Sequence, residues 1–393
     1  MTTHACEVND LTASWLARTS GTGVLSGAGL WPLLAVLAAS ADEPGRTELA
    51  EAAHVRPDEA MDAARNVLEV LDSLDGVDAA LGLWAQQAAQ VSPHWRDRLP
   101  PGTFGELTGD AETDQPMLDR WAGERTRGLI ERFPVQAGPE LMLTLATALA
   151  LRTTWTRKFT DEPLRPDDGP WAGRELAGLN RSTPELDDLR ALSTSAGALT
   201  MTRVAGDNGL DVHLVLGEDG RGPDEVMPAA VTALTPREGT DVAARDGSQL
   251  LADGDVDSWP GLSVVKATRT SLKLNTVRFT VRSDHDLLEQ ASTFGLETVS
   301  RNDRDHFPEI GPVPLRVDQA RQSAVAIFSA TGFEAAAVTA IGLRAVSMPS
   351  YNARALRVRY DRPFGFVAVH RDSGLVLFAG WVDTPAAWEP PKR

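Results

Sequence analysis

Cysteine is almost absent from this sequence, which has one, Cys6, among 393 residues. No disulfide can therefore form within the chain. We interpret the Cys6 thiol as incidental, because it lies near a terminus and no histidine or aspartate pattern surrounds it. A chain of this length can bury a large core without disulfides, so the single cysteine does not identify the cellular compartment.

Positive charge and long apolar runs are also scarce. Aspartate and glutamate number 55 against 38 lysines and arginines, which gives a net charge of −17. This acidic balance argues against nucleic acid or an anionic membrane surface as a partner, and no basic stripe suggests polyanion binding. No apolar run approaches the ~20 residues that a helix needs to cross a bilayer.

The patterns that mark common catalytic sites are missing as well. None of the seven histidines stands in a metal-ligand spacing, and a single cysteine cannot build a thiolate site. The sequence has no Gly-x-Ser-x-Gly turn, glycine-rich phosphate loop or dinucleotide fingerprint. We therefore expect a protein that is not an enzyme and that carries no metal or cofactor.

One apolar segment, residues 24–38, resembles the core of a secretory signal, and the small residues 39–41 resemble a cleavage site. A leader ending there would be about 40 residues long and would contain Glu7 and Asp10, which disfavours cleavage. A cytoplasmic location is therefore slightly favoured over secretion.

Helical patterns precede strand patterns along the chain. The predicted helices are residues 10–18, 30–39, 60–71, 79–89 and 115–131, with a short one at 286–294. The predicted strands are residues 141–151, 198–204, 209–216, 272–281, 323–328 and 356–360. This order indicates an α+β fold. No linker or repeat divides the chain, so a single domain over residues 1–393 is expected.

The most informative stretch lies between the last two groups of strands. Residues 330–340 are a run of tiny side chains behind one glycine and one glutamate, and residues 342–352 are half apolar with no consistent period. Together they make about 25 residues of loop, and a loop that long inside a compact domain is usually functional or disordered.

This stretch resembles the hinge and reactive-centre loop of the serpins, a family of serine protease inhibitors, here of the prokaryotic type. Residues 360–366 contain Asp-Arg-Pro-Phe-Gly-Phe, similar to a serpin motif, and residues 373–382 resemble the terminal serpin strand. Trp155 is similar to the family tryptophan at the top, or breach, of the main sheet. The resemblance implies helices around a large, mostly antiparallel central sheet with smaller sheets, and an exposed loop at about residues 330–355.

The resemblance also implies a mechanism. A serpin is a suicide substrate: a serine protease cleaves the loop, stays acylated, and is distorted when the hinge inserts as an extra sheet strand. Side chains alternate across a strand, so Phe333, Ala335, Ala337 and Thr339 are expected to face the core. The implied hinge residues are Gly332, Phe333, Glu334, Ala335, Ala336, Ala337, Val338 and Thr339.

Phe333 departs from the family pattern, because inhibitory serpins usually carry threonine or another small residue there. An overpacked ring would cost roughly 1–3 kcal/mol and slow insertion, whereas a ring with room would contribute about 1.5–3 kcal/mol.

A second departure affects the shutter, the hydrogen-bond network at which serpin sheets open. Its usual two serines, asparagine and histidine align with Ser26, Gly29, Thr147 and Gln322. We expect a hydrogen-bond network that differs from the usual one. We also consider that the missing side chain at Gly29 leaves space that the Phe333 ring fills.

Family spacing from the hinge glycine places the bait bond between Val346 and Ser347, which favours an elastase-like target. The alternative bond joins Arg344 and Ala345 and would suit a trypsin-like protease. A monomer is expected. The competing hypothesis is a non-inhibitory serpin, such as a carrier, a chaperone-like binder or a storage protein, which a protease cuts as a plain substrate.

Overall fold

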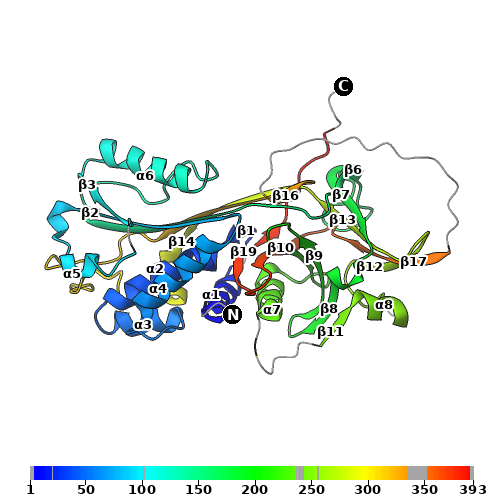
Figure 1. The fold of residues 1–393 in the computed structure, drawn as a ribbon, viewed down its shortest axis with the longest axis horizontal. Helices are drawn as coiled ribbons and strands as arrows, with labels where there is room; N and C mark the ends of the chain where they lie inside the picture. Colours follow the sequence, from blue (N-terminus) through cyan, green and yellow to red (C-terminus); the bar gives the residue numbers. More distant parts are fainter. Residues whose placement is uncertain are drawn as a thin grey trace.

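A computed structural model describes residues 4–19, 21–100, 102–235, 237, 243–254, 256–333 and 352–389. Its helices are α1 (Ala5–Leu16), α2 (Gly27–Ser40), α3 (Gly45–Ala52), α4 (Ala60–Ser73), α5 (Pro93–Arg96), α6 (Ala111–Arg125), α7 (Pro223–Leu234) and α8 (Gly247–Asp253), with short 3-10 turns η1 (Gln87–Ala89), η2 (Leu186–Asp188) and η3 (Leu287–Phe294). Helices α2, α3 and α4 cover one face of a long sheet, and α6 lies over the opposite face (Figure 1).

The long sheet consists of two sections. One has the order β3 (Phe104–Leu107), β2 (Val77–Gln86) and β4 (Leu143–Leu151). The other has the order β14 (Phe279–Asp286), β15 (Arg321–Phe328), β16 (Gly332–Phe333) and β5 (Thr153–Thr154). The sections meet where β4 continues through Arg152 into β5.

A second sheet carries much of the core. Its order is β1 (Gly23–Leu25), β19 (Val376–Val382), β18 (Phe364–His370), β10 (Leu210–Leu216), β9 (Gly197–Ala205), β8 (Leu189–Thr194) and β11 (Ala244–Asp246). All seven residues of β19 are buried. Such nearly continuous apolar runs are expected of strands covered on both faces.

The third sheet has β17 in an interior position. Its order is β12 (Leu262–Ala267), β17 (Ala353–Arg359), β13 (Leu272–Val277), β7 (Leu176–Thr183) and β6 (Thr160–Leu164). Strands β12 and β13 are consecutive in the sequence, yet β17 lies between them, antiparallel to β12 and parallel to β13.

The apolar segment that resembled a secretory signal is the buried helix α2. The side chain of Ser26 caps it by accepting a hydrogen bond from the Gly29 amide. Almost every residue of the helix is buried, as expected of a helix that is apolar all round. Among the described residues, no helix has both the length and the apolar character that a membrane crossing requires.

The α+β class and the helix and sheet arrangement are confirmed, but two predicted elements are wrong. Residues 79–89 were expected to be helical because alanine favours helices, and they lie mostly in β2, which pairs with β4 over nine positions. Pairing and burial override a weak propensity there. Residues 272–281 form two strands of different sheets, β13 and β14, because the chain changes sheet at Arg278.

Candidate functional site

The first two residues of the predicted hinge are part of the long sheet. Gly332 and Phe333 form β16, which pairs antiparallel with Phe328 of β15 on one side and with Thr153 and Thr154 of β5 on the other. The chain reverses between β15 and β16 in a tight turn. The Ser329 amide donates to the Gly332 carbonyl over 3.0 Å, and the Ser329 hydroxyl donates to the same carbonyl over 3.0 Å.

Trp155 holds this turn through both its side chain and its backbone. Its indole Nε1 donates to the Ser329 carbonyl over 2.9 Å, and its backbone amide donates to the Thr331 carbonyl over 3.0 Å. Its ring centroid lies 4.9 Å from that of Phe328, and only 2% of the residue is exposed. Trp155 therefore lies beside the turn that leads into β16.

Gly332 and Phe333 each suit their positions. A Cβ on Gly332 would lie 2.3 Å from the backbone carbonyl oxygen of Thr153, so no side chain fits there. Phe333 is 2% exposed, and its ring centroid lies 6.1 Å from that of Phe366. The ring is thus accommodated in the core of the uncut protein. Its effect on insertion, by overpacking or by added burial, stays a prediction.

Below β16 the long sheet is divided by a slot. Within the described residues, β4 pairs only with β2, and β15 pairs only with β14 and, at Phe328, with β16. The facing edges of β4 and β15 therefore have no strand between them. A cavity of about 490 Å³ occupies the lower part of the slot, lined by residues of β4, β15, α2 and α6. Unpaired strand edges of this kind are a template for an added strand.

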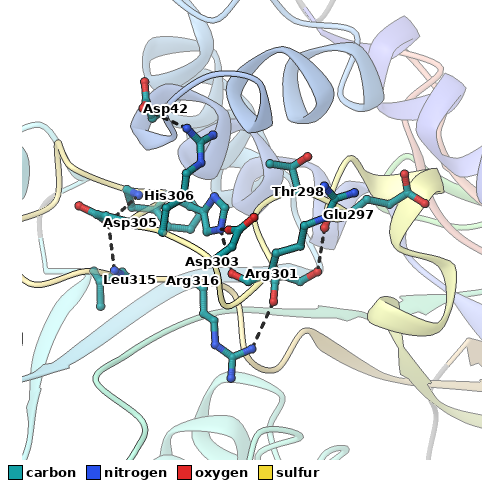
Figure 2. A network of polar contacts seen from close by, with 12 residues as sticks. Asp42, Glu297, Thr298, Arg301, Asp303, Asp305, His306, Leu315 and Arg316 are labelled. Carbon is teal, nitrogen blue, oxygen red and sulfur yellow. Dashed lines mark hydrogen bonds and ion pairs between the residues drawn. The ribbon is translucent and has the colours of Figure 1, made fainter.

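A polar network holds the loop that closes the lower end of this cavity (Figure 2). His306 is fully buried, and its Nε2 lies 2.8 Å from the Arg301 carbonyl oxygen. The His306 amide donates to the Leu315 carbonyl, and the carboxylate of Asp305 accepts from the amides of Leu315 and Phe307, all over 3.0 Å. These contacts fix the loop between η3 and β15.

The four residues aligned with the shutter lie together between the start of α2 and the two strands that border the slot, β4 and β15. The Gln322 side chain joins the Ser26 backbone twice, accepting from its amide and donating to its carbonyl, each over 2.9 Å. The Ser26 hydroxyl donates to the Leu377 carbonyl over 2.6 Å. The Thr147 hydroxyl donates to the Gly29 carbonyl. The network links α2, β4 and β15, which are the elements on both sides of the slot.

The suggestion that Gly29 makes room for Phe333 is wrong. The atoms nearest to a Cβ on Gly29 belong to Ser26 and Leu149. Thr147 contacts Gly29 and Thr153 pairs with Phe333, and six residues of extended chain span roughly 20 Å. The two sites are therefore separate.

Residues Glu334, Ala335, Ala336, Ala337, Val338 and Thr339 of the predicted hinge lie outside the described residues, as do both candidate bait bonds, Val346 to Ser347 and Arg344 to Ala345. These assignments stay predictions.

Asn208 is a site residue that the sequence did not reveal. It lies in the turn between β9 and β10, and its Nδ2 donates to the carbonyls of Asp75 and Arg152, each over 2.9 Å. The Thr153 hydroxyl donates to the Asn208 Oδ1 over 2.6 Å. Asp-Asn-Gly predicts a turn, but nothing in the sequence indicates that this turn forms hydrogen bonds with the junction of β4 and β5.

Arg181 was missed for a similar reason, since a lone arginine in a strand pattern gives no signal of burial. It is 6% exposed, it donates to the carbonyls of Arg157 and Arg203, and its guanidinium lies 4.9 Å from the centre of the Phe159 ring. Burial lowers its pKa to about 10, so it stays charged at neutral pH. It supports the segment from Trp155 to Phe159 that holds the hinge turn.

Comparison with known proteins shows which proteins this chain is similar to. The family model for serpins, serine protease inhibitors, matches residues 233–385. A serine protease inhibitor of Cyanea capillata is 22% identical over 377 residues, covering 90% of each chain. An uncharacterized serpin-like protein of Pyrobaculum aerophilum is 22% identical over 322 residues, 79% of this chain and 76% of that one.

The fold of a thermophilic serpin, tengpin, in its native state superposes with a TM-score of 0.71 at 13% identity, covering 97% of this chain and 94% of that one. These matches in sequence and fold support membership of the serpin family. Serpins are generally inhibitors of serine proteases and are not themselves enzymes.

Proposed function

We propose that this chain inhibits a serine protease as a suicide substrate, and that residues 332–339 insert between β15 and β4 after cleavage. One observation carries the proposal: Phe333 is already paired with both β15 and β5, at the head of a slot whose edges are otherwise unpaired within the described part of the chain. The inserted strand would extend a pairing that has begun.

Continuing the same register gives each inward residue a matching place. The sequence numbers of residues facing across β15 and β16 add to a constant, and so do those across β16 and β5. The continued register would place Ala335 between Ala326 and Leu151, Ala337 between Ala324 and Leu149, and Thr339 between Gln322 and Thr147.

These neighbours suit the residues they would receive. Ala324, Ala326, Leu149 and Leu151 are buried, so alanine can enter beside them with little displacement. Thr339 would arrive among the polar groups of the shutter, where a hydroxyl can find a partner. Insertion would also supply partners to the strand edges of the slot, and buried backbone groups without partners are costly. This difference is the free energy that would distort a bound protease.

We propose the bond between Val346 and Ser347 as the bait, with an elastase-like protease as target, because a small β-branched residue suits a shallow apolar pocket. Cleavage between Arg344 and Ala345 by a trypsin-like protease is the alternative. We propose that the inhibitor acts as a monomer, since one chain supplies the bait, the hinge and the slot.

Incubation with an elastase-like and a trypsin-like protease, followed by a denaturing gel, tests the proposal. A band at the summed mass that resists denaturant is the expected result, and mass spectrometry of the released C-terminal peptide identifies the bait bond. Cleavage without that band, together with no gain in heat stability after cleavage, would favour the non-inhibitory alternative.

A further inference from the structure

Two cations lie side by side on the outward face of the third sheet. Lys273 of β13 is directly opposite Arg357 of β17, and Ser182 and Ser263 continue the same cross-strand row on β7 and β12. Adjacent strands lie about 4.8 Å apart, and both cations are half-buried. Because they are 84 positions apart in sequence, no basic stripe is visible there.

Neither cation has a hydrogen-bond or ion-pair partner within the described part of the chain, although acids lie close by. Glu162 accepts a hydrogen bond of 2.6 Å from the Asn180 amide, and Asp361 pairs with Arg359 over 2.8 Å. Like charges directly opposite one another destabilise a sheet. An anion from outside the chain would relieve this repulsion.

The two cations line a hollow rather than a flat surface. The cavity measures about 490 Å³, and its wall includes Ser182, Asn275 and Glu162 as well as Lys273 and Arg357. This volume is within the range of binding sites for small groups. Hydroxyl and amide groups beside two cations can complete the coordination of a carboxylate.

The position of the hollow indicates its occupant. β17 begins at Ala353, shortly after the residues expected to carry the bait bond, and the stretch of strand from Ala353 to Arg357 spans only about 13 Å. A protease that grips the bait would therefore reach this face. We propose that Lys273 and Arg357 form a docking site for an acidic surface of the target protease. This inference rests on the proposed inhibitory function.

Docking of this kind acts mainly on the rate of encounter. Complementary charge at the rim of an interface raises the association rate and its salt dependence. The chain as a whole, with a net charge of −17, repels an acidic partner. The cation pair would therefore favour proteases that present carboxylates at one place and disfavour uniformly acidic ones.

The first test reads binding without requiring inhibition. A fluorescein-labelled hexaglutamate peptide is titrated with the intact protein at low ionic strength, and anisotropy is recorded. The charge-reversed variant Lys273→Glu with Arg357→Glu is expected to bind about tenfold more weakly or worse. The control, Lys266→Glu with Arg269→Glu, changes net charge equally at exposed positions and is expected to bind like the wild type. Circular dichroism confirms that both variants are folded.

Absence of peptide binding by the wild type, or an equal loss in the control, would overturn the proposal. Sodium sulfate is added as a competitor beside sodium chloride of equal ionic strength. Equal displacement is expected, whereas much stronger displacement by sulfate would identify a small-oxyanion site and overturn the protease as occupant.

The second test uses the protease that forms the covalent complex. The charge-reversed variant is expected to associate about tenfold more slowly at low salt, to approach the wild type at high salt, and to keep the same inhibition stoichiometry. An unchanged rate at low salt would contradict docking at this site. If no protease forms a complex with the wild type, the inhibitory function fails instead, and the peptide titration still reports separately on the cation pair.

Discussion

Phe333 lies directly opposite Phe328 across the antiparallel pair of β15 and β16, and both rings are buried in one core. The four residues between them form the turn that a completed hairpin would need. Closing a loop is an entropic cost that precedes the contacts it makes possible. Because this turn exists before cleavage, insertion would begin by elongation instead of nucleation.

The variant Phe333→Thr tests the anchoring role of the ring. Loss of the buried ring is expected to lower the free energy of unfolding by about 3 kcal/mol and to release the start of the hinge. Denaturant unfolding and titration of active protease measure stability and stoichiometry. We expect stoichiometry to rise, whereas an overpacked ring would make it fall.

A matched control is Phe294→Ala, which truncates a fully buried phenylalanine of η3. It is expected to lower stability without changing stoichiometry. If both variants raise stoichiometry equally, general instability explains the effect and Phe333 has no special role.

Gly332→Ala should displace the hinge from the sheet. Its Cβ would lie 2.3 Å from the Thr153 carbonyl oxygen, so the backbone must shift at a cost of about 1–3 kcal/mol. Limited proteolysis of the loop and thermal unfolding measure the effect. Gly138→Ala is the control, because no atom lies within 4 Å of its Cβ position. Unchanged stability of the Gly332 variant would show that β16 is not fixed as described.

Gln322→Ala should weaken the shutter. The substitution removes two hydrogen bonds to the Ser26 backbone. The Ser26 carbonyl keeps the Leu30 amide as a donor, so the main loss is the acceptor of the Ser26 amide, at about 1–3 kcal/mol. Chemical unfolding measures the loss.

The control for the shutter is Gln319→Ala. Gln319 bridges the backbone of Gln136 in the same two-bond manner, but these two contacts are exposed to solvent, so water can replace them. Similar losses in both variants would mean that the shutter is no more critical than a surface contact.

Stability is expected to fall in mild acid because of His213. This residue lies on β10 between Arg203 and Val367, and burial lowers its pKa from 6.5 to about 4. The unfolded chain takes up this proton first as the pH falls. The contribution is therefore complete above about pH 6.5 and is lost toward pH 4, by up to about 3 kcal/mol.

Unfolding of His213→Gln across this pH range measures the effect, and its stability should depend less on pH than that of the wild type. His94→Gln changes an exposed histidine and should leave the wild-type slope intact. A steep slope retained in the His213 variant would assign the acid sensitivity to other groups.

Local patterns predicted the elements that their own residues identify. Alternation and turn residues identify the hairpin of β9 and β10, and an unbroken apolar run identifies the buried helix α2. The helix predicted at residues 79–89 was wrong because the alanines there favour a helix locally, whereas pairing with β4 makes this segment strand β2.

The same distinction between local pattern and long-range contact applies to the residues of the site. Ser26, Trp155 and Gln322 were found through a family resemblance that specifies their position. Asn208 and the Lys273–Arg357 pair depend on contacts between strands far apart in sequence, which no local pattern encodes. The separation of Gly29 from Phe333 likewise required coordinates, because alignment gives positions but not distances.

The interior place of β17 has a further consequence for the uncut protein. An intact loop could enter the slot fully only if the chain after it were drawn along, and β17 is the segment that would have to leave. It is paired along one edge with β12 and along the other with β13, so its departure would break two ladders at once. The pairing with β12 and β13 would thus hold β17 in place and oppose full entry of an uncut loop. Under the proposed function, the stored free energy would then be kept until a protease cuts the loop.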